Sequence, residues 1–397
     1  MKNYLTKFAA LSSYNVWKNS AFYVEPNVTL IKNGNEIVQV IYQSITEGGS
    51  SEPDEPITPD PSGSGSGSGN GSGEESHNYA NDYFTSIARE DNMSFSLYQC
   101  DTTDMIAYSL DNGETWITES SNATITTPLL NNGDKVLWKF DRISTAEHDG
   151  YGYYVVNWHD SLLGGFSGTG NFDVEGNIMS LLYGDNFINQ TDLLIREYVF
   201  SELFKWQNHL INASNLILPA TILTNYCYSY MFNGCTSLVT TPVLPATTLA
   251  DYCYQNMFYG CTSLTAAPAL PATTLTQYCY QSMFYGCTSL TTAPALPATT
   301  LAQNCYDCMF SECTELTTAP ELPATTLAQG CYSNMFYGCT SLNYIKCLAT
   351  DISTSDCTSS WVQYVASSGT FVKAASMTSW TTGVNGRPSG WTVEDAT

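Results

Sequence analysis

The 397-residue sequence has few basic residues. Its 13 Lys and Arg are set against 37 Asp and Glu, which gives a net charge of −24, and no Lys or Arg occurs between Lys205 and Lys346. Nucleic-acid binding draws most of its affinity from basic groups that neutralise phosphates, so we expect no nucleic-acid partner. The same deficit argues against docking on an anionic membrane surface.

Long apolar runs are also missing. No segment approaches the roughly 20 consecutive apolar residues that span a bilayer, so we expect no membrane insertion. The start, MKNYLTKFAALSSYN, has only the short apolar run 8–11, which is too brief for the h-region of an export signal. We therefore expect a chain that is made in the cytoplasm without a signal peptide. An extracellular role would need release by lysis, or an N-terminus different from the one shown.

Catalytic motifs are scarce as well. The four histidines are His77, His148, His159 and His209, and none has the spacing of a triad or of a metal site. Neither G-x-x-x-x-G-K-[ST] nor G-x-G-x-x-G occurs. The sequence therefore predicts no enzyme, no catalytic residues, no metal site and no cofactor.

The first 76 residues differ in composition from the rest. Within 1–46, VTLIKNGNEIVQVI alternates apolar and polar residues around Asn33-Gly34, which predicts a β-hairpin. So short a segment buries little surface alone, and we expect it to anchor the chain on a partner or on copies of itself. A frayed leader is the alternative. Residues 47–76, first Pro- and acid-rich and then Gly/Ser-rich, predict a flexible linker.

Residues 77–190 predict an all-β sandwich or barrel. The expected strands are 93–100, 105–110, 115–120, 135–140 and 152–158. Among them SLDNGETW (109–116) matches the S-x-D-x-G-x-T-W Asp-box hairpin of sialidase propellers. There is one copy, and the arginines that a sialidase would cluster are scattered, so we interpret it as a turn in which Asp111 bonds the backbone and Trp116 packs.

Residues 191–360 contain repeats. Five 26-residue units run from Leu218 to Cys347, each beginning Leu-Pro-Ala-Thr. A degenerate unit precedes them, because the sequence of residues 198–204 is similar to that of residues 226–232. Another degenerate unit follows them and contains Cys357 and Trp361. Such strict periodicity predicts a stack in which each unit buries its apolar face against its neighbours. Residues 361–397, which hold three tryptophans, are expected to cap the last unit.

The second unit illustrates the expected local structure. Four of its residues fall on one side at intervals of four: Leu249, Cys253, Met257 and Cys261. This spacing predicts a helix of roughly three turns that ends at Gly260. Residues 264–270 predict a short strand, kinked at Pro268. The predicted fold is therefore mainly β with short helices, a leucine-rich-repeat solenoid preceded by a small all-β domain and a flexible linker.

Thirteen of the 14 cysteines lie in or beside the repeats, at the repeat period. The two predicted core columns are Cys227, Cys253, Cys279, Cys305 and Cys331, and Cys235, Cys261, Cys287, Cys313 and Cys339. Free Cys behaves as a small hydrophobe, so we expect buried thiols. Disulfides or a metal array remain alternatives, although a metal would need ligands that converge within one unit.

Aromatic and polar residues on the opposite side of the predicted helix are the candidate ligand contacts. They are Tyr252, Asn256 and Tyr259 in one unit and Tyr278, Ser282 and Tyr285 in the next. Such rings can stack on sugar faces or anchor a protein partner. The alternative is that they pack sideways between neighbouring repeats. The sequence leaves both open.

The units, with their MFxGCTSL and LPATTLAxxCY segments, resemble the BspA-like leucine-rich repeats of gut Bacteroidetes and of their phages, over residues 198–365. This resemblance implies a surface-displayed adhesion module without catalytic residues. Residues 1–46 resemble the short leader of virion proteins from Bacteroides-infecting phages, including crAss-like ones. That likeness implies attachment to capsid or tail proteins.

These features together predict a phage virion fibre or decoration protein at the virion surface. Its leader would anchor it, and its repeat head would bind host-surface glycans or proteins. We expect a homo-oligomer, with a trimer as the simplest case. One alternative is a bacterial cell-surface adhesin of the same repeat family. A glycan-processing enzyme is a second, but it would require clustered acids and arginines.

Overall fold

The computed structural model describes residues 27–33, 36–43, 78–99, 105–118, 124–141, 163–193, 197–378 and 380–397. The chain forms two compact units, Met1–Glu74 and Glu75–Thr397. In the first unit, β1 (Asn27–Asn33) and β2 (Glu36–Gln43) pair antiparallel with Asn33 opposite Glu36. The predicted hairpin is thereby confirmed. The predicted linker at 47–76 lies outside the described residues.

The second unit begins with two β-sheets. The larger has the strand order β11 (Leu210–Ile217), β10 (Phe172–Asn177), β3 (Phe84–Ala88), β8 (Lys135–Asp141), β5 (Met105–Ser109) and β6 (Ile117–Thr118). The smaller has the order β7 (Thr124–Thr126), β4 (Phe95–Gln99) and β9 (Leu163–Gly168). Phe84 and Trp138 of the larger sheet pack edge-on against Phe166 of the smaller, at centroid distances of 5.6 and 5.4 Å. The two sheets therefore form a sandwich, while the predicted strand at 152–158 lies outside the described residues.

Helix is rare in the part of the chain that the structure describes. It comprises the α-helix α2 (Ser180–Tyr183) and the short 3₁₀ segments η1 (Tyr79–Asn81) and η2 (Gly184–Asn186). The fold is thus mainly β with short helices, as predicted. Among these described residues, no helix has both the length and the apolar character to cross a membrane.

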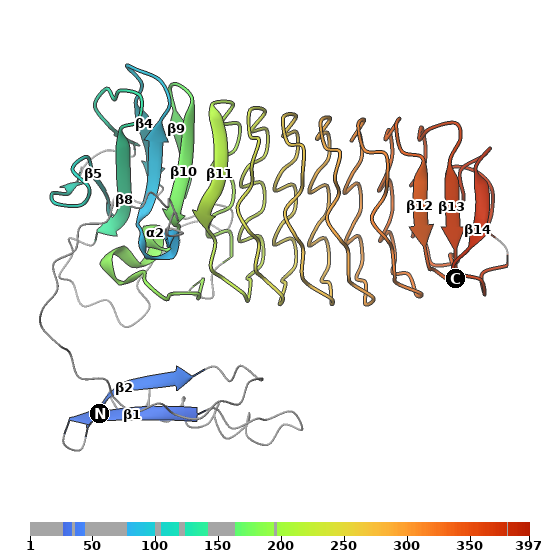
Figure 1. The fold of residues 1–397 in the computed structure, drawn as a ribbon, viewed down its shortest axis with the longest axis horizontal. Coiled ribbons are helices and arrows are strands. Elements are labelled where there is room, and N and C mark those ends of the chain that lie inside the picture. Colours follow the sequence, from blue (N-terminus) through green and yellow to red (C-terminus); the bar gives the residue numbers. More distant parts are fainter. Residues whose placement is uncertain are drawn as a thin grey trace, which may run out of the picture. The chain divides into compact units, whose positions relative to one another are not determined.

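From Tyr198 the chain winds through a row of similar coils, and those after β11 are drawn from yellow-green to orange in Figure 1. Isolated parallel bridges join neighbouring coils, such as those from Ala266 to Thr292 and from Thr274 to Thr300. The predicted strand at 264–270 is therefore reduced to a single bridge. The row ends in a parallel sheet of β12 (Tyr344–Cys347), β13 (Thr370–Lys373) and β14 (Thr392–Asp395).

The helix predicted over residues 249–260 is wrong, because this segment is a run of turns. Tyr252, Asn256 and Gly260 have φ angles of 60°, 55° and 70°, whereas every residue of an α-helix has negative φ. Alternate N–H groups also have different acceptors. The Gln255 N–H donates to the Tyr252 carbonyl within the coil, whereas the Tyr254 N–H donates to the Cys279 carbonyl of the next coil.

The spacing of the buried residues explains the error. An α-helix turns by about 100° per residue, so residues 249 and 261 would lie about 120° apart around a helix. An interval of four fits the run of turns instead, in which positive φ recurs at every fourth residue. The pattern holds in seven successive coils, from Tyr198, Glu202 and Trp206 in the first to Asp356, Ser360 and Tyr364 in the last.

The sandwich and the coils share one hydrophobic core. The buried cluster runs without a break from Phe84 to Trp391. Phe204 of the first coil contacts Phe84 and Phe166 of the sandwich, and β11 pairs with β10 in parallel. The boundary predicted between residues 190 and 191 therefore does not divide the chain into two separate hydrophobic cores. Instead, the sandwich covers one end of the stack of coils.

Three tryptophans lie at the other end. Trp361 is fully buried and stacks on Trp380 at 5.8 Å, in the column that Met335 and its counterparts occupy in earlier coils. The Trp391 Nε1 donates to the Ala366 carbonyl. These contacts, together with β13 and β14, keep the apolar side of the last coil away from water.

The Asp111 turn joins β5 to β6. Asp111 accepts hydrogen bonds from the Ser109 hydroxyl and from the Thr115 N–H, both at 2.8 Å, and from the Thr115 hydroxyl. These bonds, those from Thr115 foremost, lower the pKa of Asp111 from 3.8 to about 2. Trp116 packs against Tyr83 at 5.0 Å and below the Lys139 ammonium. The motif is therefore fully engaged in local structure.

Replacement of Asp111 by Asn should destabilise the fold in a pH-dependent way. Because the folded-state pKa is depressed, the carboxylate's contribution is complete above about pH 4 and disappears as the pH falls towards about 2. The urea midpoint of the parent protein should fall over this window, and that of Asp111→Asn should fall less. Glu114→Gln, at an exposed carboxylate of the same turn, is the control. Parallel pH profiles of parent and Asp111→Asn would contradict the assignment.

Candidate functional site

Four tyrosines form a ladder on the outside of the turn runs. Tyr198, Tyr226, Tyr252 and Tyr278 occupy the same position in successive coils, and their rings stack with centroids 4.5, 4.5 and 4.6 Å apart and planes within 8°. Each of the four has positive φ, between 56° and 60°. A shared backbone conformation thus places identical side chains directly above one another. We call this row the outer tyrosine ladder.

A second, shorter ladder lies seven residues further along each coil. Tyr259 and Tyr285 stack at 4.7 Å with planes 3° apart. Tyr259 is 37% exposed and Tyr285 is half-buried. Two of the predicted contact pairs, Tyr252 with Tyr278 and Tyr259 with Tyr285, are therefore face-to-face neighbours. The sequence left sideways packing open as an alternative, and the structure shows that it occurs.

Stacking decides which parts of the rings a ligand can reach. Inside the outer ladder both faces of a ring are covered, so only ring edges and hydroxyls meet solvent. Burial and the neighbouring Tyr198 and Tyr252 raise the pKa of Tyr226 to about 12. Burial also raises the pKa of Tyr252. The hydroxyls of Tyr226 and Tyr252 therefore stay protonated at neutral pH and can donate as well as accept hydrogen bonds.

Asn256 requires a correction among the predicted contacts. Only 8% of its surface is exposed, because its position lies between two coils and its N–H donates to the Gln281 carbonyl. The equivalent Ser282 is half-buried. The expected outward side of a helix does not exist here, so residues four apart do not share solvent exposure.

Sequence reasoning missed a row of polar side chains beside the tyrosines. The Gln255 Nε2 donates to the Gln281 Oε1 at 2.6 Å, and the Gln281 Nε2 donates to the Asp307 Oδ2 at 2.8 Å. Identical residues at one position of successive units were the signal for such a row. These bonds link three coils through side chains as well as through the backbone.

Trp206 was also missed, although it is 68% exposed. It occupies the position at which Gly234, Gly260 and Gly286 stand in the following coils, and the Lys205 ammonium lies 4.9 Å from its ring. The signal was the alignment of YVFSELFKWQ with YCYSYMFNGC, in which a tryptophan replaces a glycine. Trp206 ends the column of glycines on the side of the sandwich.

The unit at 296–321, which we call the divergent coil, differs in sequence from the others. Asn304 replaces the tyrosine of the outer ladder, and Ser311 replaces that of the short ladder. Four of the five carboxylates in units 218–347 lie in this one unit, at Asp307, Glu312, Glu315 and Glu321. Both ladders consequently stop at the same boundary between coils.

The ten predicted core cysteines are all buried and unpaired. In the second column each thiol donates to a phenylalanine carbonyl of the preceding coil, as from Cys261 to Phe232 at 3.2 Å and from Cys287 to Phe258 at 3.1 Å. Burial raises the pKa of Cys227 and of Cys287 to about 12. A buried neutral thiol is a poor nucleophile and a poor metal ligand, so these columns serve packing.

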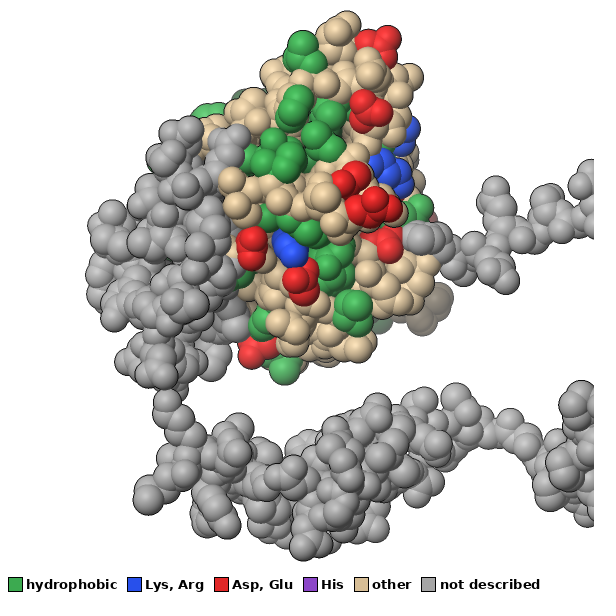
Figure 2. Space-filling model, turned by 90° about the vertical axis from the view of Figure 1, so that its left-hand side faces the viewer, with side chains coloured by type: hydrophobic (Ala, Val, Ile, Leu, Met, Phe, Trp, Pro, Cys, Tyr) green, Lys and Arg blue, Asp and Glu red, His purple; other side chains and the backbone are tan. Residues whose placement is uncertain are grey.

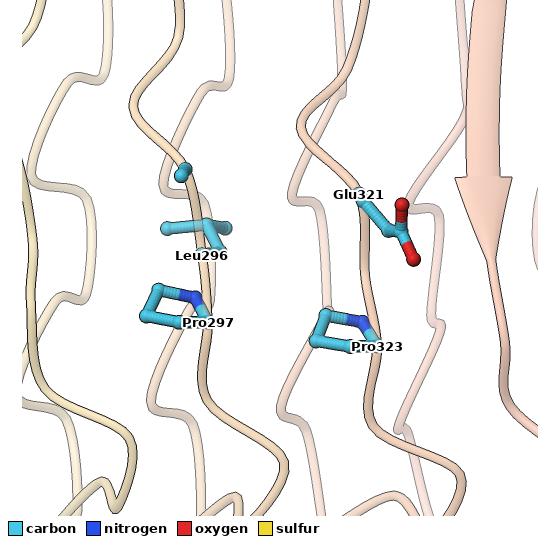
Figure 3. Close-up of a pocket in the computed structure, with 5 residues that line it drawn as sticks. Leu296, Pro297, Glu321 and Pro323 are labelled. Atoms are coloured by element: carbon cyan, nitrogen blue, oxygen red, sulfur yellow. The ribbon is translucent and has the colours of Figure 1, made fainter.

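The other long side of the coils is lined by small residues. Exposed threonine pairs recur at 247–248, 273–274 and 299–300. Beside them a groove of about 290 Å³ lies between Pro297 and Pro323, bordered by Ala295, Leu296 and Glu321 (Figure 3). The Glu321 carboxylate is paired with Lys346 at 2.9 Å. The groove therefore lacks the convergent, unpaired polar groups that fix a small ligand.

Among the residues that the structure describes, the sandwich contains one arginine, Arg89, rather than the cluster that a sialidase would use. Figure 2 shows hydrophobic side chains there among scattered acidic ones, with few basic side chains. His209 is the only histidine that the described ranges include, and its Nδ1 lies 3.4 Å from the Asn171 Oδ1. Within those ranges no three His, Cys, Asp or Glu side chains converge as metal ligands would.

Thiol alkylation tests the cysteine assignment. Cys308 is the only half-buried cysteine among the thirteen described. Burial and the nearby Asp307 raise its pKa to about 12, so native iodoacetamide labelling at Cys308 should be slow and rise about tenfold per pH unit around neutrality. Peptide mapping by mass spectrometry should find the ten column cysteines unmodified until the protein unfolds. Cys308→Ser is the control. Labelling of Cys261 or Cys287 in the native protein would contradict their burial.

Comparisons of the chain with protein-family models, with curated proteins and with solved structures give no match. The candidate functional features of this protein are its two tyrosine ladders, its polar side-chain row and the unit at 296–321.

Proposed function

We propose that this protein is an adhesion protein displayed on a phage particle. Its coils form a leucine-rich-repeat solenoid of the BspA-like type, and this head binds glycans or proteins on the host surface. Residues 1–46 attach the head to capsid or tail proteins, and the linker at 47–76 gives it reach.

The observation that carries the proposal is the surface of the coils. The coils present tyrosine edges in four successive coils, exposed threonine pairs at 247–248, 273–274 and 299–300, and a row of side-chain amides, without a Lys or Arg between Lys205 and Lys346. Hydroxyls, amides and aromatic rings are the groups that bind neutral polar ligands. Repetition of the same groups favours weak contacts at many points, which many copies on one particle convert into avidity.

The catalytic alternative has less support. Asp111, the acid of the Asp-box-like turn, is occupied by Ser109 and Thr115. The cysteine thiols are buried, and the four carboxylates of unit 296–321 face no arginine in that unit. A bacterial cell-surface adhesin would use the same coils in the same way, and it differs from our proposal in what the first 46 residues contact.

Adhesion can be tested with the fluorescently labelled full chain on intact Bacteroides cells. We expect saturable binding that periodate oxidation of the cell-surface glycans reduces, at an affinity in the micromolar range or weaker for single heads. An equally acidic, unrelated protein is the control. Binding no greater than that of this control on every isolate tested would refute adhesion.

The anchoring role predicts a difference in mass by light scattering. The full chain should form a defined oligomer, whereas a variant that begins at Glu75, where the second compact unit starts, should be a monomer. A small hairpin buries too little apolar surface to be stable alone, so association between copies of the hairpin would bury its remaining apolar surface. If both proteins are monomers, the first unit does not self-associate. Attachment to another protein, as in the adhesin alternative, then gains support.

A further inference from the structure

We propose that the end of the outer tyrosine ladder, at Tyr278 beside Asn304, is a binding site for one neutral pyranose ring of a surface glycan. This inference rests on the proposed adhesive function and names the place and the ligand class. The ring would occupy the position of a missing fifth tyrosine.

The backbone continues unchanged where the tyrosines stop. Asn304 has φ of 53° and Gly330 has φ of 61°, close to the 56° of Tyr278. The next two coils therefore provide the same platform without its rings. Since neighbouring rings in the ladder lie 4.5 to 4.6 Å apart, the ladder ends in a step that is as deep as one aromatic side chain.

Asn304 does not fill this step. A Cβ atom placed on Gly330 would lie 2.1 Å from the Asn304 Oδ1, so the Asn304 side chain leans along the stack towards Gly330. It leans away from Tyr278, which precedes it. Within this column of residues, no aromatic ring therefore covers the face of Tyr278 that points to the divergent coil, whereas the rings of Tyr226 and Tyr252 are covered by rings on both faces.

The groups beside the step suit a sugar. The Gln303 Nε2 donates to the Tyr278 hydroxyl at 3.3 Å, and Gln329, at the equivalent position in the next coil, is exposed. A pyranose has an apolar C–H face that packs on an aromatic ring, and its equatorial hydroxyls need donors and acceptors around the rim. Side-chain amides supply both.

Charge narrows the class of sugar. The column continues beyond Gly330 with the exposed Asp356, and the divergent coil carries Asp307 and Glu312. No Lys or Arg lies between Lys205 and Lys346 to hold an anionic group. Uronic and sialic acids would be repelled, so the site favours neutral sugars. An apolar protein side chain would leave the amides unpaired, which disfavours a protein ligand.

Filling the step with a fifth ring tests the proposal. Asn304→Tyr adds a fifth ring at a position whose φ already suits tyrosine in four coils, and it covers the open face of Tyr278. Asn334→Tyr is the matched control. It makes the same substitution in the next coil, at Asn334, whose φ is 50°. Tyr230 occupies the equivalent position in an earlier coil with φ of 58°, which shows that this backbone accepts a tyrosine. Equal melting temperatures of the three proteins establish that both variants fold.

The probes are surface polysaccharides extracted from cells that the full chain binds, separated by ion exchange into neutral and anionic fractions. The parent and Asn334→Tyr should bind the neutral fraction alike. Asn304→Tyr should bind about tenfold more weakly, as expected for the loss of one stacked ring.

The outcomes separate this site from adhesion itself. If the parent binds cells, but Asn304→Tyr and the parent bind the neutral fraction with equal affinity, the proposed site is overturned. Adhesion itself then still stands. Binding confined to the anionic fraction, or cell binding that survives periodate and so points to a protein ligand, overturns the neutral-sugar assignment. Absence of cell binding by the parent refutes adhesion, and the site with it.

Discussion

Positive φ at every fourth residue is the constraint on which the stack depends. It turns the chain so that alternate N–H groups close turns within a coil and the others reach the carbonyls of the next coil. A left-handed backbone costs a non-glycine residue about 1–2 kcal/mol. A hydrogen bond between coils returns roughly 0.5–1.5 kcal/mol, and the buried aromatic columns add more. The conformation persists because each coil holds its neighbour in the same one.

This backbone converts sequence repetition into columns of identical side chains. Inside the stack, Phe232 lies against Phe258 at 5.4 Å and Tyr228 against Tyr254 at 5.8 Å. Cysteines fill the remaining narrow positions, where a small thiol can bond a carbonyl of the previous coil. Outside the stack, the same rule produces the tyrosine ladders. A residue that breaks a column therefore changes the surface at one defined place.

The divergent unit at 296–321 shows why such a break matters. Its backbone follows the same angles as its neighbours, so the change is confined to side chains. Asn304 ends the outer ladder and Asp307 accepts the last bond of the glutamine row. A uniform stack offers only ring edges, whereas a column that stops offers a ring face next to polar groups. Under the proposed adhesive function, recognition would depend on interruptions of the repeat as much as on the repeat itself.

The sequence by itself determined the repeat period, the mainly β class, the hairpin at Asn33 and the burial of the cysteine columns, since each follows from spacing and side-chain chemistry. It could not choose between a helix and a run of turns, because both place residues 253 and 257 on the same side. It also could not show that Tyr252 and Tyr278 cover each other, or that Asn256 is buried. Those outcomes depend on the distance between coils, which only the hydrogen bonds of the assembled stack decide.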